Sequence, residues 1–322
     1  MKKLSNAKID KQVAELYSRY PFPGNPIKKK SDLFQSIIYD TVYYLIKDYI
    51  DDYRDRKIKI IDVGCGTGEL ALALAAKLGT RASVVGVDRN DKSLAVARER
   101  ARKWKINNVI FKHVDLTKDK LPNGFFDFVF SIGVIHHIPE TKKMFDKLVK
   151  ITKTGGYITT GFYNPYGMMR KRLERQLLKI LAGVNIEKRM RLAKKLYYRR
   201  KLTPYEEVWA ADTYAHPFQQ YFSIEKLLRW FGEHNIEYLA SEPAIEPKKN
   251  LTLLKELIKS KMSYENVSLV KLWQRSQITN YKSKKWEKSV FVTLPTQLVW
   301  MLIGAVYGRG EFVNLVSRKK SK

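Results

Sequence analysis

The run IIDVGCGTGEL, which begins at Ile60, constrains the fold of this chain more than any other feature. A short β-rich run ends at Val63, glycines follow at positions 64, 66 and 68, and the helix-forming run ELALALAAKL begins at Glu69. Such a turn lies at the carboxyl end of a strand, where open α/β sheets bind their ligands. Alternate glycines allow a tight turn and remove the Cβ atoms that would keep a ligand from the backbone. We therefore expect a ligand-binding turn, with the N-terminus of the next helix directed at the ligand.

Short β-rich runs alternate with helical patterns along the chain from Lys57, which is typical of a parallel sheet with helices on both faces. The expected strands are residues 57–63, 83–88, 108–115, 125–133, 155–163, 236–243 and 311–319. The expected helices are residues 69–78, 91–104, 140–152 and 222–235, the last with Ser223 as a candidate N-cap. The pattern predicts an α/β fold with a doubly wound, mostly parallel, seven-stranded sheet and additional helical insertions.

The regular alternation stops after Tyr163, and this divides the chain into segments. A basic, helix-forming insertion follows to about Lys201, and a second, lysine-rich insertion covers about 248–288. We expect one catalytic domain with two insertions. Its expected parts are an N-terminal helical arm or lid (1–55), the ligand-binding core (56–165), the basic helical insertion (166–222), and the remainder of the fold with the second insertion and the last strand (223–322).

The ligand of the glycine turn can be narrowed by what surrounds the turn. No Lys-Ser or Lys-Thr pair follows the glycines, which excludes a phosphate-binding P-loop, and their alternation differs from the G-x-G-x-x-G spacing of dinucleotide sites. The carboxylate of Asp62, just before the turn, would repel a pyrophosphate but would pair with the ammonium group of an amino acid. S-adenosylmethionine carries such an ammonium group.

Two further acids stand at strand ends. Asp88 closes the second expected strand, where a carboxylate can accept both hydroxyls of a ribose, and Asp115 closes the third, where it can accept from an exocyclic adenine amine. Each acid alone has the ordinary alternative of a solvated loop acid or a helix cap. Together with Asp62, the three acids follow successive strands beside alternating glycines, and this combination favours S-adenosylmethionine as the cofactor.

In these residues the chain resembles the class I S-adenosylmethionine-dependent methyltransferases, a Rossmann-like family, and within it the type 11 and 12 group that includes the ubiquinone and menaquinone C-methyltransferases. The matching motifs within residues 57–163 are DVGCGTGEL, GVDRND, Asp115-Leu116 and FDFVFSIGVIHHIP. The resemblance implies that Gly64, Gly66 and Gly68 lie under the methionine moiety of the cofactor and that Asp88 binds the ribose. It also implies that Asp115 and Leu116 lie at the adenine and that Ser131 lies beside the site. The flanking motifs YPFPGNP, WAADTYAHPFQQYFS and QLVWMLIGAVYGRGEFVNLV are similar to an uncharacterised group of bacterial and archaeal methyltransferases.

Methyl transfer from a sulfonium requires an aligned nucleophile, and it requires a general base only when the acceptor must lose a proton. The candidate catalytic residues are His136 and His137, directly after the fourth expected strand, and Tyr163 at the end of the fifth. Their ordinary alternatives are packing against the sheet and capping of the loop. His216, in AHPFQQYF, is a further candidate for orienting a substrate, or else a loop histidine beside Pro217.

The amino-acid composition indicates in which cell compartment the protein acts and which kinds of partner it attracts. The single cysteine, Cys65, excludes an intramolecular disulfide framework and a cysteine-built metal site, and we expect no metal. The basic N-terminus lacks the apolar run of a secretory signal, and the apolar run 298–308 is about half the length that spans a bilayer. We therefore expect a cytoplasmic protein. The net charge of +29 predicts attraction to anionic surfaces or polymers.

Residues 168–201 concentrate this positive charge, with only Glu174 and Glu187 against many lysines and arginines. The first part is a basic amphipathic helix, because apolar residues recur at helical spacing, namely Leu173, Leu177, Ile180 and Leu181. Such a helix can dock on anionic lipid headgroups or follow a phosphate backbone. Alternatively, it packs its apolar face on the core and leaves its basic face in solvent.

Three functions are compatible with this sequence. The leading one is methyl transfer from S-adenosylmethionine to a small or lipid-like acceptor, by a protein peripheral to the inner face of the membrane. The second is methylation of tRNA or rRNA, which the charge suggests although the sequence contains no recognisable RNA-binding module. The third is a non-catalytic scaffold that retains the cofactor site. The motifs specify the methyl donor and leave the acceptor open.

Overall fold

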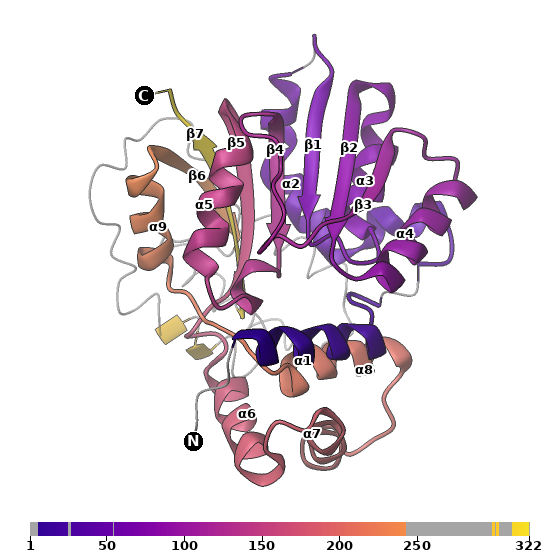
Figure 1. Cartoon of the computed structure of the whole chain (residues 1–322), viewed down its shortest axis with the longest axis vertical. Helices are drawn as coiled ribbons and strands as arrows, with labels where there is room; N and C mark the ends of the chain where they lie inside the picture. The colour runs from indigo at the N-terminus through magenta and orange to yellow at the C-terminus, as the bar shows by residue number, and fades with distance from the viewer. Residues whose placement is uncertain are drawn as a thin grey trace, which may run out of the picture.

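The computed structural model describes residues 6–24, 27–53, 55–242, 298–299, 301–302 and 311–321 (Figure 1). Its centre is a seven-stranded sheet with the order β3-β2-β1-β4-β5-β7-β6. The strands are β1 (Ile58–Val63), β2 (Ala82–Asp88), β3 (Val109–His113), β4 (Phe126–Ile132), β5 (Thr152–Tyr163), β6 (Ile236–Glu242) and β7 (Phe312–Lys319). Strands β1 to β5 are parallel, and β7 is antiparallel to both β5 and β6. The predicted doubly wound, mostly parallel sheet is confirmed.

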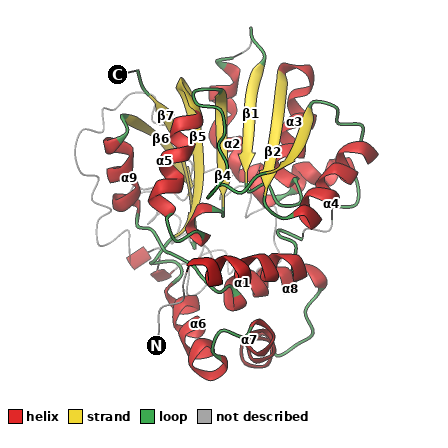
Figure 2. Ribbon diagram, viewed as in Figure 1, coloured by secondary structure: helices red, strands yellow, loops and turns green. Residues whose placement is uncertain are grey.

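Helices cover both faces of this sheet (Figure 2). One face packs against α2 (Ile37–Asp51), α3 (Glu69–Leu78) and α4 (Asp91–Lys103), and the other against α5 (Thr141–Ile151) and α9 (Ile224–Glu233). Strand β4 is buried along nearly its whole length, as expected for a central strand that is covered on both sides. Short 3-10 turns occupy Lys30–Gln35, Gly79–Arg81 and Ile135–His137.

A smaller helical layer, which we call the cap, lies beyond the carboxyl ends of the parallel strands (Figure 1). It contains α1 (Asn6–Arg19), α6 (Met169–Ala182), α7 (Ile186–Ala193) and α8 (Pro204–Ala210), with π-helical turns at Lys194–Tyr198 and Ala211–Ala215. The cap has an apolar core of its own, in which Leu16 of α1 joins Leu178, Met190 and Tyr214. The N-terminal arm and the basic insertion, far apart in sequence, therefore form one layer.

Three details differ from the sequence-based expectations. Strand β3 ends at His113, so Asp115 lies in the following turn rather than in the strand. Ser223 stands at the N-cap of α9, but its side chain makes no capping hydrogen bond. The alternative in which α6 packs its apolar face on the core is wrong, because Leu173 and Ile180 are 67% and 78% exposed.

Some expectations fall outside the described residues. The second insertion, about 248–288, is one, and only residues 298–299 and 301–302 of the apolar run 298–308 are described, as helix. Among the helices that the structure describes, none combines the length and the apolar content needed to cross a membrane.

Candidate active site

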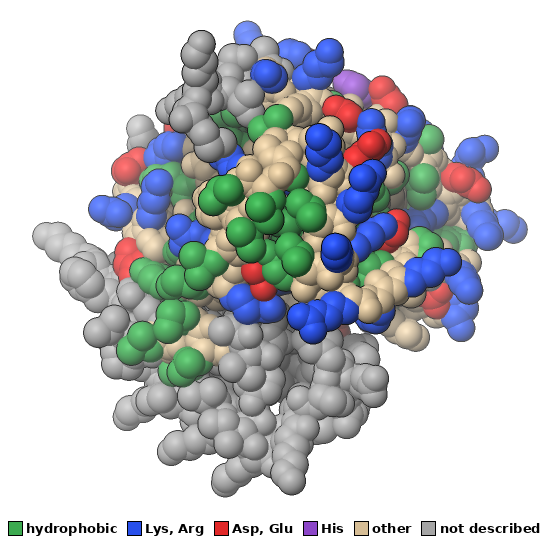
Figure 3. Space-filling view, turned by 90° about the horizontal axis from the view of Figure 1, so that it is seen from below, with side chains coloured by type: hydrophobic (Ala, Val, Ile, Leu, Met, Phe, Trp, Pro, Cys, Tyr) green, Lys and Arg blue, Asp and Glu red, His purple; other side chains and the backbone are tan. Residues whose placement is uncertain are grey.

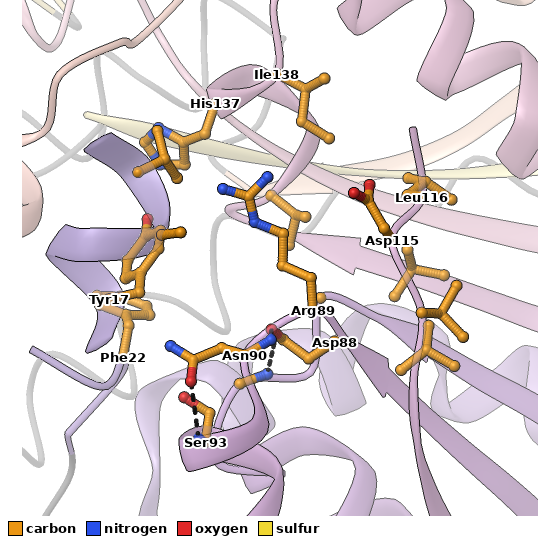
Figure 4. Close-up of a pocket in the computed structure, with 18 of the residues that line it drawn as sticks. Tyr17, Phe22, Asp88, Arg89, Asn90, Ser93, Asp115, Leu116, His137 and Ile138 are labelled. Atoms are coloured by element: carbon orange, nitrogen blue, oxygen red, sulfur yellow. Dashed lines mark hydrogen bonds between the residues drawn. The ribbon is translucent and has the colours of Figure 1, made fainter. Parts of the chain in front are cut away.

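A cavity of about 340 Å³ lies at the carboxyl ends of β1, β2 and β4, where the strand order reverses (Figure 4). The segments after these strands and after β3 form one side, and α1 of the cap forms the other through Val13, Tyr17 and Ser18. The residues predicted from the sequence that line the cavity are Gly64, Gly66, Asp88, Asp115, Leu116 and His137. The predicted residues outside its lining are Asp62, Gly68, Ser131, His136 and Tyr163.

The glycine turn lies directly under the N-terminal arm. Gly64 and Gly66 have φ values of +75° and +51°, in the left-handed region that favours glycine. A Cβ atom on Gly66 would lie 2.4 Å from the carbonyl oxygen of Phe22. The same oxygen accepts a hydrogen bond from the Thr67 N–H at 3.3 Å. The missing side chain at Gly66 thus lets the arm close over the turn.

Asp88 lines the cavity at the end of β2 (Figure 4). Its carboxylate accepts hydrogen bonds from the backbone N–H groups of Gly66 and Asn90, each at 2.8 Å. Burial raises the pKa of this carboxyl, and the two N–H groups oppose the rise. Because each carboxylate oxygen has a second lone pair, Asp88 retains the capacity to accept two hydroxyls, as ribose binding requires.

Asp115 and Leu116 form another part of the wall, in the turn after β3. One oxygen of Asp115 accepts from the backbone N–H of Thr117 at 2.9 Å and from its hydroxyl at 2.6 Å. Burial acts to raise the pKa of the Asp115 carboxyl, but the hydrogen bonds from Thr117 and the ammonium of Lys118 hold it below its usual value. A fixed anion beside a buried leucine suits a flat heterocycle that bears an amine.

Three predicted cofactor residues lie outside the cavity lining. Asp62 is buried, and burial together with the charge of Asp88 raises the pKa of its carboxyl to about 7. Gly68 is the left-handed N-cap of α3. Ser131 is fully buried on β4, and its hydroxyl has no hydrogen-bond partner among the described residues. These three residues do not form the surface of the cavity.

A buried polar cluster lies where the cap meets the cavity, around Asp212 in the π-helical turn after α8. The hydroxyl of Tyr17 donates to one oxygen of Asp212 at 2.8 Å, and that of Tyr163 donates to the other at 2.6 Å. Burial raises the pKa of both tyrosines well above the usual value, so both stay protonated donors. His137 Nε2 lies 3.7 Å from the Asp212 carboxylate. Single π-helical turns of this kind often mark functional sites.

The hydrogen-bond partners of His137 define its protonation state. Its Nδ1 lies 3.2 Å from the Phe218 carbonyl oxygen, so we assign the ring proton to Nδ1, which leaves the Nε2 lone pair beside Asp212. Burial lowers the pKa of His137 below its usual value, and Asp212 opposes this effect. The neutral ring is therefore a proton acceptor whose charged form would meet a carboxylate.

His216 completes the cluster and is buried rather than in an open loop. Its ring stacks on His137 with centroids 3.9 Å apart, and its Nδ1 accepts a hydrogen bond from the Phe218 N–H at 3.2 Å. Ligand atoms of His137, Asp212 and His216 lie within 4.8 Å of one another, a spacing compatible with a metal ion. However, the His216 proton then resides on Nε2, and stacked rings do not direct their lone pairs at one point. This geometry suits proton chemistry better than metal binding.

Comparison with known proteins assigns this architecture to a family. A family model described as a methyltransferase domain matches residues 54–231, more than half of the chain. The chain belongs to the methyltransferase-domain family. The resemblance to class I S-adenosylmethionine-dependent methyltransferases is confirmed, and with it S-adenosylmethionine as the methyl donor of the family. The matched range contains the glycine turn, the strand-end acids, His137 and Asp212.

Individual relatives of this methyltransferase match parts of it. A protein of Synechococcus that is described only as uncharacterized is 24% identical over 254 residues, which are 72% of this chain and 60% of that protein. A demethylmenaquinone methyltransferase of Shouchella clausii is 32% identical over 99 residues, 30% of this chain and 42% of that enzyme. The chain thus spans about half the length of these curated relatives. The structure of PKMT2 from Rickettsia typhi has the same fold, with a TM-score of 0.54 at 15% identity over 87% of this chain and 53% of that one.

The methyltransferase site contains two residues that sequence reasoning did not single out, Tyr17 and Asp212. They are 195 residues apart in the chain and meet only in the folded cap. Asp212 lies within WAADTYAHPFQQYFS, a motif noted for its similarity to uncharacterised relatives, and this was the one signal available. The motif gave no indication that its acid would lie beside His137.

Proposed function

We propose that this methyltransferase transfers the methyl group of S-adenosylmethionine to a small, lipid-like acceptor that loses a proton in the reaction. The observation that carries the proposal is the composition of one cavity. Glycines and acids suited to the cofactor line one part of it, and His137, backed by the Asp212 carboxylate, lines another. A bound electrophile and a base that border the same cavity are what direct methyl transfer to an acceptor hydroxyl needs.

The residues on the cofactor side fit S-adenosylmethionine. Asp88 would accept the ribose hydroxyls, Asp115 with Leu116 would hold the adenine, and Gly64 and Gly66 would lie under the methionine moiety. When bound, the cofactor supplies an electrophilic methyl group. We assign the supporting roles outside the cavity lining to Asp62, Gly68 and Ser131.

On the acceptor side, His137 is the proposed general base. A hydroxyl proton of the acceptor would pass to Nε2, and the Asp212 carboxylate 3.7 Å away would stabilise the imidazolium. Tyr163, predicted as catalytic, holds Asp212 by a hydrogen bond and does not line the cavity, so we propose that it positions this acid. His136 is fully buried with its ring centroid 4.1 Å from that of His137, and we propose that it fixes the orientation of the base.

Two observations support the proposed acceptor class, the apolar wall of the cavity and the name of one relative. The cavity beside His137 is bordered by the apolar side chains of Val134 and Ile138. The relative from Shouchella clausii is named for demethylmenaquinone. We therefore propose a lipid-like acceptor, met by a cytoplasmic protein at the inner face of a membrane, with residues 1–55 as a lid and 166–222 as the remainder of the cap.

Binding of S-adenosylmethionine, measured by calorimetry, tests the cofactor half of this proposal. We expect wild-type protein to bind it, and Gly66→Arg and Asp88→Ala to lose that binding. Glu99→Ala, an exposed acid on α4 outside the cavity lining, is the matched control and should bind as wild type does. The proposal fails if the wild type does not bind, or if Gly66→Arg and Asp88→Ala bind unchanged.

A further inference from the structure

Helix α6 carries a row of exposed apolar side chains, which we call the α6 stripe. Its members are Leu173, Leu177, Ile180 and Leu181, with exposed fractions of 67%, 45%, 78% and 57%. They follow one another at helical spacing and so share one face of the helix. Only Leu178 of α6 is buried, in the core of the cap. Exposed apolar rows of this kind are uncommon on the surfaces of monomeric proteins and are typical of interaction sites.

The charges around the α6 stripe are almost entirely positive. Both acids of α6 and α7 are already paired, since Glu174 contacts Arg170 at 3.0 Å and Glu187 contacts Arg19 at 2.6 Å. Six exposed cations within residues 168–201 have no acidic partner among the described residues, namely Arg172, Lys188, Arg191, Lys195, Arg199 and Lys201. Figure 3, which views the molecule from below, shows a group of hydrophobic side chains with Lys and Arg beside it on the described surface.

The stripe belongs to the same helical layer that closes the cavity. Leu16 of α1 packs with Leu178 of α6 in the core of the cap, while Tyr17, the next residue, lines the cavity. Helix α1 therefore contributes both to the core that holds α6 and to the wall of the cavity.

We propose that the α6 stripe inserts into the headgroup region of an anionic lipid bilayer, with the surrounding lysines and arginines on the lipid phosphates. An apolar row flanked by cations is the pattern of helices that lie in the plane of a membrane surface.

The stripe contains no aromatic side chain, whereas single-stranded RNA is held largely by stacking on aromatic rings. A second copy of the chain would bring two positive faces together, which like-charge repulsion opposes. The inference rests on the proposed function, because a lipid-like acceptor would be found at the membrane that the stripe is proposed to bind.

Co-sedimentation with vesicles tests this surface. Vesicles of equal parts phosphatidylglycerol and phosphatidylcholine should sediment the wild-type protein, pure phosphatidylcholine should not, and added salt should weaken the binding. The double variant Leu177→Gln with Ile180→Gln should bind at least about tenfold more weakly. Ile110→Gln, a residue of β3 that is 50% exposed and lies outside the cap, is the matched control and should bind as wild type.

Affinity for S-adenosylmethionine, measured on the same samples, separates this inference from the proposed function. The double variant should keep that affinity, which also shows that it is folded. Equal vesicle binding by the double variant and the wild type would overturn the docking surface. If vesicle binding is absent while cofactor binding persists, the surface is wrong and the methyltransferase proposal stands.

A fluorescent dye attached to the α6 stripe would show which partner covers this surface. Leu177→Cys can be labelled selectively, because Cys65 is buried and burial raises the pKa of its thiol well above the usual value. A polarity-sensitive dye there should shift to shorter wavelength only when phosphatidylglycerol vesicles are added. A shift that is already present without vesicles would show that the chain itself covers the stripe, and a shift that grows with protein concentration would show that a second copy does. A shift that tRNA produces instead would show that RNA binds there. Each of these outcomes would overturn the proposal.

Discussion

The hydroxyl of Tyr163 donates a 2.6 Å hydrogen bond to the carboxylate of Asp212, and this bond ties the end of β5 to the cap. The second oxygen of the same carboxylate receives the hydroxyl of Tyr17 from α1. Asp212 is thereby held from two sides, at 3.7 Å from His137. The environment of the proposed base is fixed jointly by the sheet and by the cap, although the two are encoded far apart in the chain.

Replacement of Asp212 by asparagine tests this arrangement. Asp212→Asn keeps the size of the side chain but removes the charge that raises the pKa of His137. Methyl transfer should fall by at least about 100-fold, and the acid limb of its pH profile should move to lower pH. Affinity for S-adenosylmethionine should not change.

The control for this variant is Asp146→Asn, because Asp146 also contacts a histidine, His234 at 2.7 Å, but does not line the cavity. It should keep the wild-type rate and pH profile. An unchanged pH profile in Asp212→Asn would contradict the role of Asp212.

The contact between Gly66 and Phe22 predicts how a small substitution acts. In Gly66→Ala the new methyl group would meet the Phe22 carbonyl oxygen, so we expect the N-terminal arm to shift and cofactor affinity to fall by about tenfold. Gly79→Ala has a similar φ of +55° but an open space around its Cβ, and it should bind the cofactor normally. Equal affinities of the two variants in calorimetry would show that the arm does not depend on this contact.

The pKa of about 7 at Asp62 predicts the pH dependence of cofactor binding. Although Asp62 lies outside the cavity lining, the charge of its ionised form would attract the cofactor ammonium. Affinity should therefore rise as pH increases toward about 7, by up to about tenfold per pH unit, and level off above that pH. The measurement belongs below about pH 7.7, where the ammonium itself begins to lose its proton. Asp62→Asn should abolish the rise, and a variant that retains it would rule out Asp62 as its origin.

The buried histidines predict that the folded protein loses stability at acidic pH. Burial lowers the pKa of His136 and His216 well below the usual 6.5, so below that pH the unfolded chain binds protons that the folded chain does not. The free energy of unfolding should therefore fall as pH drops below about 6.5, by up to about 1.4 kcal/mol per pH unit for each histidine. Asp62 titrates in the opposite sense, since its folded pKa is raised and its contribution is lost as pH rises through about 7.

A comparison of the wild type with His216→Gln isolates one histidine from these opposing effects. Urea unfolding curves at several pH values should show a shallower loss of stability on acidification in the variant. Parallel curves for the two proteins would mean that His216 takes up protons equally in the folded and unfolded states.

The sheet and the cofactor loop could be predicted because their signals are local. The alternating glycines and Asp88 belong to one strand–turn–helix–strand unit, and the parallel pairing of its two strands brings their carboxyl ends together. The boundary of β3 was less accurate, since a residue such as Val114 suits either a strand or the turn that Asp115 forms with Thr117.

The cap could not be predicted in the same way. Helical spacing shows that Leu173 and Ile180 share a face, but it does not show whether that face is buried or exposed. The Tyr17–Asp212 contact depends on how α1 packs on the turn after α8, and no local pattern encodes the meeting of segments 195 residues apart.

The most direct test of the account follows the methyl group itself. Purified protein, S-adenosylmethionine labelled on its methyl group and a cell extract would be incubated together, and the products separated into lipid, RNA and protein pools. Label should enter the lipid pool with wild-type protein and should be absent with Asp88→Ala. Label in the RNA or protein pool, or no transfer to any pool by a protein that binds the cofactor, would contradict the account.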